Sequence, residues 1–241
     1  MKILIIPDIH NKIFKSNLII KKENPDQIVY LGDWFDSFDD DLTLTEATTR
    51  YLKDILYDED KIFIYGNHDL HYRFNYDNII GTGYTKEKYN LINSILTYDD
   101  WNQFRSYYKV DNWYLSHAGI CKSLVMHPIT GFSQKHLDEL IKSQFLNLQY
   151  NDDRSPLYEI GHNRGGKNKI GGLTWCDIGE FEPIENINQI FGHTYQNHPM
   201  FITNKQKNTK NWCIDSYLDF YGMIIDGKFD IYKFDKGEID E

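Results

Sequence analysis

The sequence predicts an α/β fold that is built on a parallel β-sheet and completed by a second sheet. Short apolar runs rich in Ile and Val lie at residues 3–7, 27–31 and 61–65, and stretches of helical periodicity lie between them at residues 14–22 and 43–57. This βαβαβ order predicts parallel strands joined by helices. Beyond residue 192, short runs separated by turns, with Asp226-Gly227 as a hairpin signal, predict a second, largely antiparallel sheet.

The middle of the chain adds further elements. Residues 87–107 have mostly helical character, residues 113–115 form a short apolar run, and residues 133–149 have helical periodicity. Residues 161–172 are polar and rich in glycine, so we interpret them as a surface loop beside the functional site, with a flexible connection as an equal alternative. Residues Asn188–Phe191 predict one more strand.

Composition and charge limit the class of protein. The chain has 241 residues, of which 41% are hydrophobic, so a single domain over residues 1–241 can bury a core without disulfides. The net charge of -10 argues against a broad nucleic-acid-binding surface, because such surfaces use clustered Lys and Arg. Phosphate binding would therefore need local positive charge, which divalent cations provide.

Cysteine usage and hydropathy bear on location. The three cysteines lack a CxxC pair, which favours reduced thiols over a disulfide framework. The first apolar run is too short for a secretion signal, and no apolar run reaches the roughly 20 residues of a membrane span. We expect a cytoplasmic protein that does not associate with membranes, and the sequence predicts no particular oligomeric state.

Polar residues directly follow the predicted strands, and in a parallel sheet such positions meet along one edge. They supply carboxylate, imidazole and amide groups from Asp8, His10, Asp33, Asn67, His117 and His193. This mixture suits Mn, Fe, Zn or Ni better than Ca or a thiolate zinc site. Six ligands can hold two ions if one carboxylate bridges them, and such a pair can activate a water and hold a phosphoryl group.

Five motifs contain these residues. They are Asp8-x-His10, Gly32-Asp33-x-x-Asp36, Gly66-Asn67-His68-Asp69, Ser116-His117-Ala118-Gly119 and Gly192-His193-Thr194. In spacing and order the set resembles the signatures of the calcineurin-like metallophosphoesterases. The resemblance implies a four-layer αββα sandwich, with two mixed β-sheets flanked by helices and a metal site at the C-terminal ends of the strands. Residues 126–172 are then expected to be a helical and loop insertion that shapes the substrate crevice.

By this resemblance each motif residue has an expected role. The metal ligands would be Asp8 and His10 for the first ion, Asp33 for both ions, and Asn67, His117 and His193 for the second. His68 would stay free and give a proton to the leaving group, oriented by Asp36, because a carboxylate partner keeps an imidazolium protonated. A metal-bridging hydroxide would be the nucleophile. The histidines outside the motifs, His71 among them, are expected to be turn formers or satisfied polar groups.

Arginine positions bear on substrate binding. Looser similarities, such as Asn163-Arg164-Gly165-Gly166, favour the phosphoprotein phosphatase and diadenosine tetraphosphatase group. In that group an arginine commonly follows the GDxxD motif and binds phosphate, whereas Ser37 occupies its place here. Arg164 is the first candidate for a phosphate ligand and Arg73 the second, because guanidinium groups make paired hydrogen bonds to phosphate; a solvated surface arginine is the alternative for each. Asn67 is also expected to contact the substrate.

The expected function is hydrolysis of a phosphate monoester, such as phosphoserine or phosphothreonine in proteins, with two divalent metal ions as cofactors and manganese as the expected ion in vitro. The first alternative is a dinucleoside polyphosphate hydrolase or phosphodiesterase, which the same centre supports. The second alternative is a non-catalytic scaffold. The expected partner is a phosphorylated substrate, either a phosphoprotein or a nucleotide.

Overall fold

The computed structural model describes residues 1–126, 131–150, 155–204 and 208–235. Its strands form two sheets, and their bounds are β1 (Lys2–Ile6), β2 (Gln27–Tyr30), β3 (Lys61–Ile64), β4 (Phe104–Arg105), β5 (Tyr107–Val110), β6 (Trp113–Ser116), β7 (Asn188–Phe191), β8 (Met200–Asn204), β9 (Thr209–Cys213), β10 (Phe220–Ile225) and β11 (Lys228–Lys233). The predicted strands of the first 70 residues are confirmed to within one or two residues at each end.

Both sheets are mixed. In the first sheet the order is β11-β10-β1-β2-β3-β4, with β1 to β4 parallel and the β10-β11 hairpin added antiparallel at the free edge of β1. In the second sheet the order is β5-β6-β7-β9-β8, and its central strands β6, β7 and β9 are parallel. The expectation of a largely antiparallel second sheet built from the C-terminal strands is therefore wrong, because the hairpin at Asp226-Gly227 joins the first sheet.

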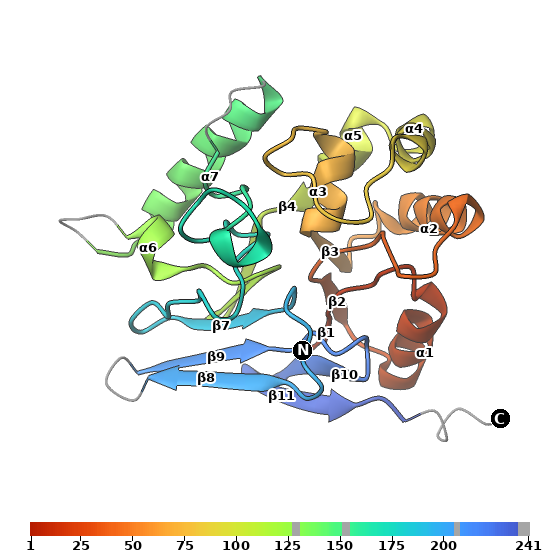
Figure 1. Ribbon diagram of the computed structural model, residues 1–241. Coiled ribbons are helices and arrows are strands. Elements are labelled where there is room, and N and C mark those ends of the chain that lie inside the picture. The colour runs from red at the N-terminus through yellow and green to blue at the C-terminus, as the bar shows by residue number, and fades with distance from the viewer. Residues whose placement is uncertain (127–130, 151–154, 205–207, 236–241) are drawn as a thin grey trace.

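Helices cover both outer faces of the two sheets, which confirms the predicted layers. Their bounds are α1 (Ile13–Glu23), α2 (Leu42–Ile55), α3 (Asn67–Arg73), α4 (Lys86–Ile95), α5 (Tyr98–Trp101), α6 (Lys122–Val125), α7 (Gln134–Gln149) and the 3-10 helix η1 (His162–Arg164). Figure 1 shows α1 to α5 together on one side of the molecule and α6 and α7 on the other. The prediction that residues 87–107 are mostly helical is right for α4 and α5 and wrong for Phe104–Arg105 and Tyr107, which are in strands.

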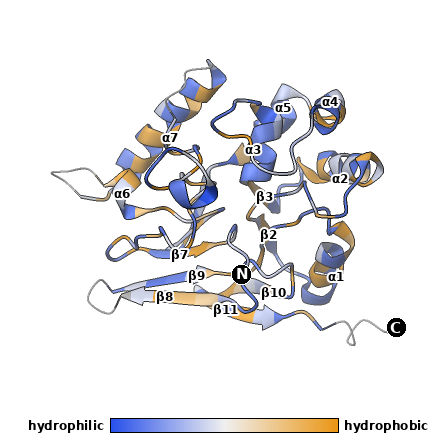
Figure 2. Ribbon diagram, viewed as in Figure 1, coloured by the Kyte–Doolittle hydropathy of each residue, from blue (hydrophilic) through white to orange (hydrophobic). Residues whose placement is uncertain are grey.

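Local sequence explains where the long helices begin. The Asp41 carboxylate accepts a hydrogen bond from the backbone N–H of Leu44 at 2.8 Å and caps α2, while Ser133 caps α7 by accepting from His136 at 3.2 Å. Figure 2 shows hydrophobic and hydrophilic bands alternating along α7, as expected for a helix with one face on the protein core.

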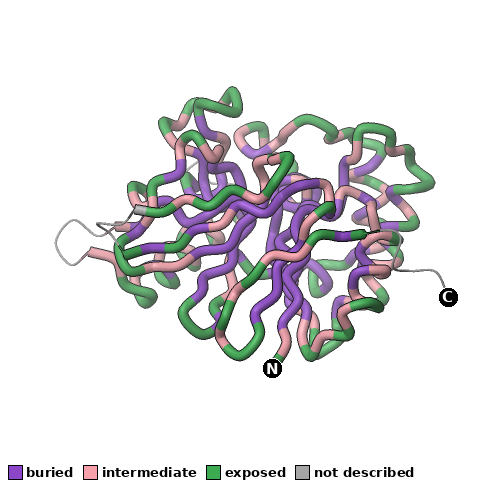
Figure 3. The backbone as a smooth tube through the Cα atoms, turned by 90° about the horizontal axis from the view of Figure 1, so that it is seen from below, coloured by how far each residue is buried: buried purple, intermediate pink, exposed green. Residues whose placement is uncertain are grey.

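The core has a layer between the sheets and a layer under the helices. Ile3 and Ile5 of β1 pack between the sheets with Leu115 of the second sheet, whereas Leu4 and Ile6 belong to the cluster under the helices. Figure 3 shows the buried backbone gathered in the interior of the molecule, and β1, β2, β3 and β6 are buried along most of their length. A strand that is buried on both faces has a continuous run of apolar residues, and such runs predict β1, β2 and β3 from the sequence. Within the described residues, no helix has both the length and the apolar character needed to cross a membrane.

Candidate metal centre

The structure brings all six predicted ligands to one edge of the two sheets. The first sheet supplies residues that follow β1, β2 and β3, and the second supplies residues that follow β6 and β7, so the carboxyl ends of five strands meet there. Asp8, Asp33, Asn67 and His117 are each no more than 2% exposed. Their close grouping gives two sets of acidic and histidine side chains whose ligand atoms lie within 4.8 Å of one another, namely Asp8, His10 and Asp33, and Asp33, His117 and His193.

The second set has the spacing of a metal coordination shell. Oδ1 of Asn67 lies 3.0 Å from Nε2 of His117 and 2.9 Å from Nδ1 of His193, and the two imidazole nitrogens are 3.2 Å apart. Oδ2 of Asp33 lies 3.4 Å from Nε2 of His117. Metal bonds of about 2.0–2.2 Å place neighbouring ligand atoms about 3.0–3.5 Å apart, so these four side chains fit one divalent ion.

The first set shares Asp33 with the second. Oδ2 of Asp33 lies 3.6 Å from Nε2 of His10. Asp8 is fixed differently, because both of its carboxylate oxygens accept from the backbone N–H of His193, at 3.0 and 3.1 Å. Asp33 therefore occupies the position between the two sets that a bridging carboxylate would need.

Hydrogen bonds fix which histidine nitrogen faces the centre. Nδ1 of His117 lies 2.9 Å from the carbonyl oxygen of Leu31, and Nδ1 of His10 lies 2.9 Å from that of Phe35. A carbonyl only accepts, so each Nδ1 donates its proton there and each Nε2 faces the centre, where it can bind a metal once it is deprotonated.

Asp69 ties the turns after β2 and β3 together. Its carboxylate accepts from the backbone N–H groups of Asp33, Trp34 and Gly66, each at 2.8 Å. Asp33 itself has a left-handed backbone with φ of 51°, a conformation that a non-glycine residue holds only when its surroundings fix it. The sequence placed Asp69 in a motif but indicated no role for it. The structure shows that its carboxylate holds the two turns that carry Asp33 and Asn67.

His68 has the carboxylate partner that the sequence predicted. Nδ1 of His68 is 2.8 Å from Oδ2 of Asp36, and the backbone N–H of His68 donates to Oδ1 of Asp33 at 2.8 Å. Burial alone would lower the pKa of His68, but the charge of Asp33 and the hydrogen bond to Asp36 outweigh it and raise that pKa above its usual value. The imidazolium is therefore stabilised at this position.

Asp36 has three further partners that the sequence did not reveal. His71 lies 2.9 Å from Oδ2 of Asp36, while the Tyr72 hydroxyl at 2.6 Å and the Lys88 ammonium at 2.9 Å donate to Oδ1. His71 is thus a buried histidine whose ring nitrogen is satisfied by a carboxylate. Asp36, His68 and His71 also have ligand spacing, but the Lys88 charge and these hydrogen bonds already satisfy the carboxylate.

The electrostatics of the centre favour a cation. Burial and repulsion from the carboxylates of Asp215 and Asp33 raise the pKa of Asp8 well above its usual value. Burial would lower the pKa of His117, but attraction to Asp33 and Asp8 raises it to about 10. A divalent cation among these groups would stabilise the ionised carboxylates in place of protons.

The two candidate arginines lie in different places. Nε of Arg164 forms an ion pair with Asp177 at 2.8 Å, and its Nη2 donates to Oγ1 of Thr194 at 3.0 Å, so Arg164 lies beside the residue that follows His193.

Arg73 instead donates to the carbonyl oxygen of Trp101 and to Oδ1 of Asn102, both at 2.8 Å, and its guanidinium lies over the ring of Phe145. Arg73 therefore lies against an aromatic cluster, and its role in substrate binding stays a prediction.

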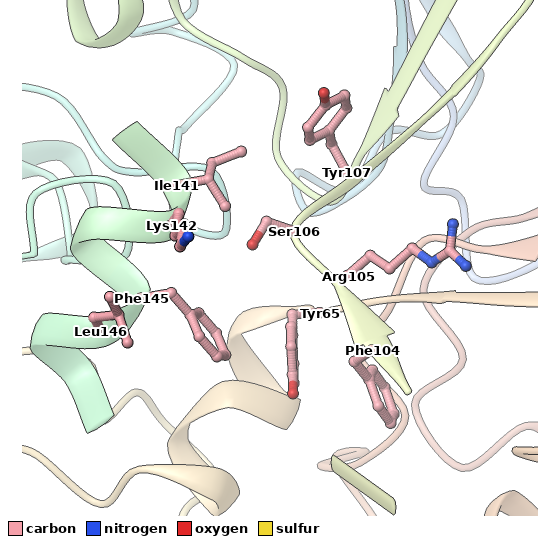
Figure 4. A pocket seen from close by; sticks show the side chains of 9 residues that line it. All are labelled: Tyr65, Phe104, Arg105, Ser106, Tyr107, Ile141, Lys142, Phe145 and Leu146. Carbon is pink, nitrogen blue, oxygen red and sulfur yellow. The ribbon is translucent and has the colours of Figure 1, made fainter. Parts of the chain in front are cut away.

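A cavity of about 360 Å³ lies between α7 and the residues that connect the two sheets. Figure 4 shows Ile141 and Phe145 of α7 on one side of it and Tyr65 and Ser106 on the other. Tyr65 directly follows β3, so the cavity lies near the edge that carries the ligands. Within the predicted insertion 126–172, residues 127–130 and 151–154 lie outside the described residues.

The fold and the site together define a two-sheet α/β protein with a buried set of carboxylate, imidazole and amide groups suited to divalent metals. The chain belongs to the calcineurin-like phosphoesterase family, whose family model matches residues 1–200. Membership implies a hydrolase that acts on phosphate esters and typically binds divalent metal ions.

Three solved structures are similar to the chain at low sequence identity. A protein serine/threonine phosphatase from Saccharomyces cerevisiae with similarity to human phosphatase PP5 has a TM-score of 0.52 and 12% identity, over 97% of this chain and 79% of that chain. A candidate diadenosine tetraphosphatase has a TM-score of 0.47 and 16% identity, over 98% and 95% of the two chains. A metallophosphoesterase from Sphaerobacter thermophilus has a TM-score of 0.47 and 12% identity, over 98% and 88%. The yeast structure shows the shared fold. No curated protein sequence matches the chain significantly.

Proposed function

We propose that the protein hydrolyses phosphate monoesters at a dinuclear metal centre, with phosphoserine or phosphothreonine in proteins as the expected substrate. The observation that supports this most strongly is the pair of ligand sets that share the Asp33 carboxylate. Asp8 and His10 would complete the first metal site, and the second would use the three ligands Asn67, His117 and His193. Manganese, iron, zinc or nickel would fit these ligands.

The chain's own groups would bind and orient the substrate and move one proton. Two divalent ions, when bound, would supply the activated water and the positive charge that hydrolysis of a phosphate ester needs. Asp36 holds Nδ1 of His68, so Nε2 would carry the proton given to the leaving oxygen. Asn67 would contact a phosphate oxygen as well as metal.

Arg164 is the proposed phosphate ligand of this group. Its ion pair with Asp177 leaves part of the guanidinium available, and its side chain is 31% exposed beside Thr194. A paired hydrogen bond to phosphate would use the remaining N–H groups. We expect Arg164→Ala to raise the Michaelis constant at least about tenfold, the loss of one charge-assisted contact. An unchanged Michaelis constant and turnover would remove Arg164 from the site.

Cleavage of a dinucleoside polyphosphate or a phosphodiester is the second candidate. It is supported by Ser37, which stands where the phosphatase group commonly has a phosphate-binding arginine, and whose Oγ accepts from Asn11 at 3.2 Å. In both proposals residues 126–172 would shape the substrate crevice, because α7 lines the cavity near the sheet edge that carries the candidate metal ligands.

The test is hydrolysis of four substrates in the presence of manganese: p-nitrophenyl phosphate, bis-p-nitrophenyl phosphate, a phosphothreonine peptide and diadenosine tetraphosphate. Asp33→Asn removes the shared ligand and His68→Ala the proton donor, and the exposed His198→Ala is the matched control. We expect both site variants to lose activity and the control to keep it, and preference for a monoester to identify a phosphatase. Activity that survives both site substitutions would contradict the dinuclear mechanism. An inactive protein that takes up no metal would favour the non-catalytic scaffold.

A further inference from the structure

Lys12 places an unpaired positive charge beside the metal centre. It lies two residues after His10, and its Nζ lies 4.6 Å from the centroid of the Tyr217 ring. The described residues include no hydrogen-bond acceptor or ion-pair partner for this ammonium. A half-buried ammonium without an acceptor is unusual, because such groups are normally paired when they leave water.

Carboxylates of the centre, Asp215 and Asp8, attract the Lys12 ammonium. Asp215 is only 3% exposed and follows β9, so it joins Asp8 and Asp33 as a third buried carboxylate at this edge. The positive charge of two divalent ions would exceed the negative charge of these three carboxylates. With Lys12 added, the filled centre would have a net positive charge that a phosphate dianion would neutralise.

An aromatic pair holds the lysine in place. The rings of Tyr195 and Tyr217 stack with centroids 4.3 Å apart, and Tyr195 lies two residues after His193. Tyr217 and Leu218 have left-handed backbones, with φ of 56° and 62°, in the turn that presents the Tyr217 ring to Lys12. Contact with an aromatic face limits the freedom of a lysine side chain and leaves its N–H groups able to donate to a ligand.

The residue before Lys12 contacts the position of the missing arginine. The preceding residue, Asn11, donates from Nδ2 to Oγ of Ser37 at 3.2 Å and to Asp40 at 3.2 Å. The backbone N–H of Asn11 donates to the carbonyl oxygen of Trp34 at 2.9 Å. The turn that carries Lys12 is thus bonded to the segment in which related phosphatases have their arginine.

We propose that Lys12 binds an oxygen of the substrate phosphate, with Tyr217 holding its side chain, and thereby supplies the charge that Ser37 does not. This inference rests on the proposed phosphoesterase function. The rival explanation is that Lys12 only balances the buried carboxylates of Asp8 and Asp215. The two differ in what the lysine stabilises: a bound anion in the first case, the folded, metal-binding protein in the second.

The experiment measures binding of inorganic phosphate to the manganese-loaded protein by isothermal titration calorimetry, together with manganese affinity and the kinetics of p-nitrophenyl phosphate hydrolysis. Lys12→Gln removes the charge and Lys12→Arg keeps it. Lys15→Gln is the matched control, because Lys15 lies on the next turn and is already paired with Asp219 at 2.5 Å.

We expect Lys12→Gln to weaken phosphate binding at least about tenfold, the loss of one charge-assisted hydrogen bond, and to raise the Michaelis constant similarly. Lys12→Arg should recover most of the binding, and manganese affinity and Lys15→Gln should match wild type. Unchanged phosphate affinity in Lys12→Gln would overturn the inference. So would a loss accompanied by weaker manganese binding and not recovered by arginine, because that pattern marks a structural role.

The experiments distinguish a failure of the Lys12 inference from a failure of the proposed function. If the loaded wild-type protein hydrolyses none of the substrates but its phosphate binding depends on Lys12, the inference stands and the proposed reaction is wrong. If hydrolysis depends on Asp33 and His68 while phosphate affinity is the same in wild type and Lys12→Gln, the proposed function stands and the role of Lys12 is wrong.

Discussion

Gly192→Ala tests how closely the backbone approaches the candidate metal ligands. A Cβ atom on Gly192 would lie 2.0 Å from Oδ1 and 3.2 Å from Cγ of Asp8. Non-bonded heavy atoms normally stay about 3.5 Å apart, so the carboxylate must move by about 1.5 Å. The φ angle of Gly192 is not positive, and alanine therefore adds no backbone strain of its own. The substitution acts by displacing Asp8.

The expected magnitude follows from the precision that such a site needs. Site groups must be held within about 0.5 Å of their working positions, and a displacement of about 1 Å can cost about 100-fold in rate. We therefore expect Gly192→Ala to lower kcat/KM for p-nitrophenyl phosphate at least about 100-fold and to weaken manganese binding, while circular dichroism shows a folded protein.

Gly227→Ala is the control for this substitution. Gly227 has a φ of 78° in the β10-β11 turn, and an added Cβ would meet only Oδ2 of Asp111, at 3.6 Å. It should cost about 1 kcal/mol of stability through backbone strain and leave metal affinity unchanged. Wild-type manganese affinity and kcat/KM in Gly192→Ala would refute the assignment of Asp8 as a ligand held by this contact.

Three further predictions concern residues around the centre. Asp69→Ala should lower the free energy of unfolding by about 3–6 kcal/mol, because three buried backbone N–H groups lose their acceptor; urea denaturation measures this, and a loss below about 1 kcal/mol would contradict it. Asp36→Asn should lower kcat about 100-fold or more with little change in KM, because His68 loses the partner that orients its proton; a change in KM alone in steady-state assays would argue against that role. Removal of metal by a chelator should lower the thermal unfolding midpoint, because an ion at 100 times its Kd adds about 2.7 kcal/mol of stability; identical midpoints by calorimetry with and without chelator would show that the folded protein binds no ion.

The sequence predicted the first half of the fold because its physical signal is local. Strands β1, β2 and β3 are buried on both faces and so read as continuous apolar runs between amphipathic helices. No local pattern indicates which sheet the β10-β11 hairpin joins. Its pairing with β1 rather than with the second sheet depends on tertiary packing. Strand β4 has only two residues, Phe104–Arg105, too few to show alternation.

In the candidate site, too, residues with a local sequence pattern were predictable and residues brought in by tertiary packing were not. Residues that directly follow strands were predictable, because the carboxyl ends of parallel strands must meet. Lys88 was not, because it reaches Asp36 from 52 positions away in the sequence. The contacts of Arg73 were not predictable either: it lies six positions after Asn67 on α3, and at about 100° per residue its side chain points to another face of the helix.

The most direct test of the central claim is the number of manganese ions bound per chain, measured by isothermal titration calorimetry and elemental analysis for wild type and for Asp33→Asn. Shared use of the Asp33 carboxylate by two ligand sets predicts two ions per wild-type chain and a loss of tight binding at both sites in the variant. A wild-type chain that binds at most one ion, or a variant that keeps two with unchanged affinity, would contradict the dinuclear centre.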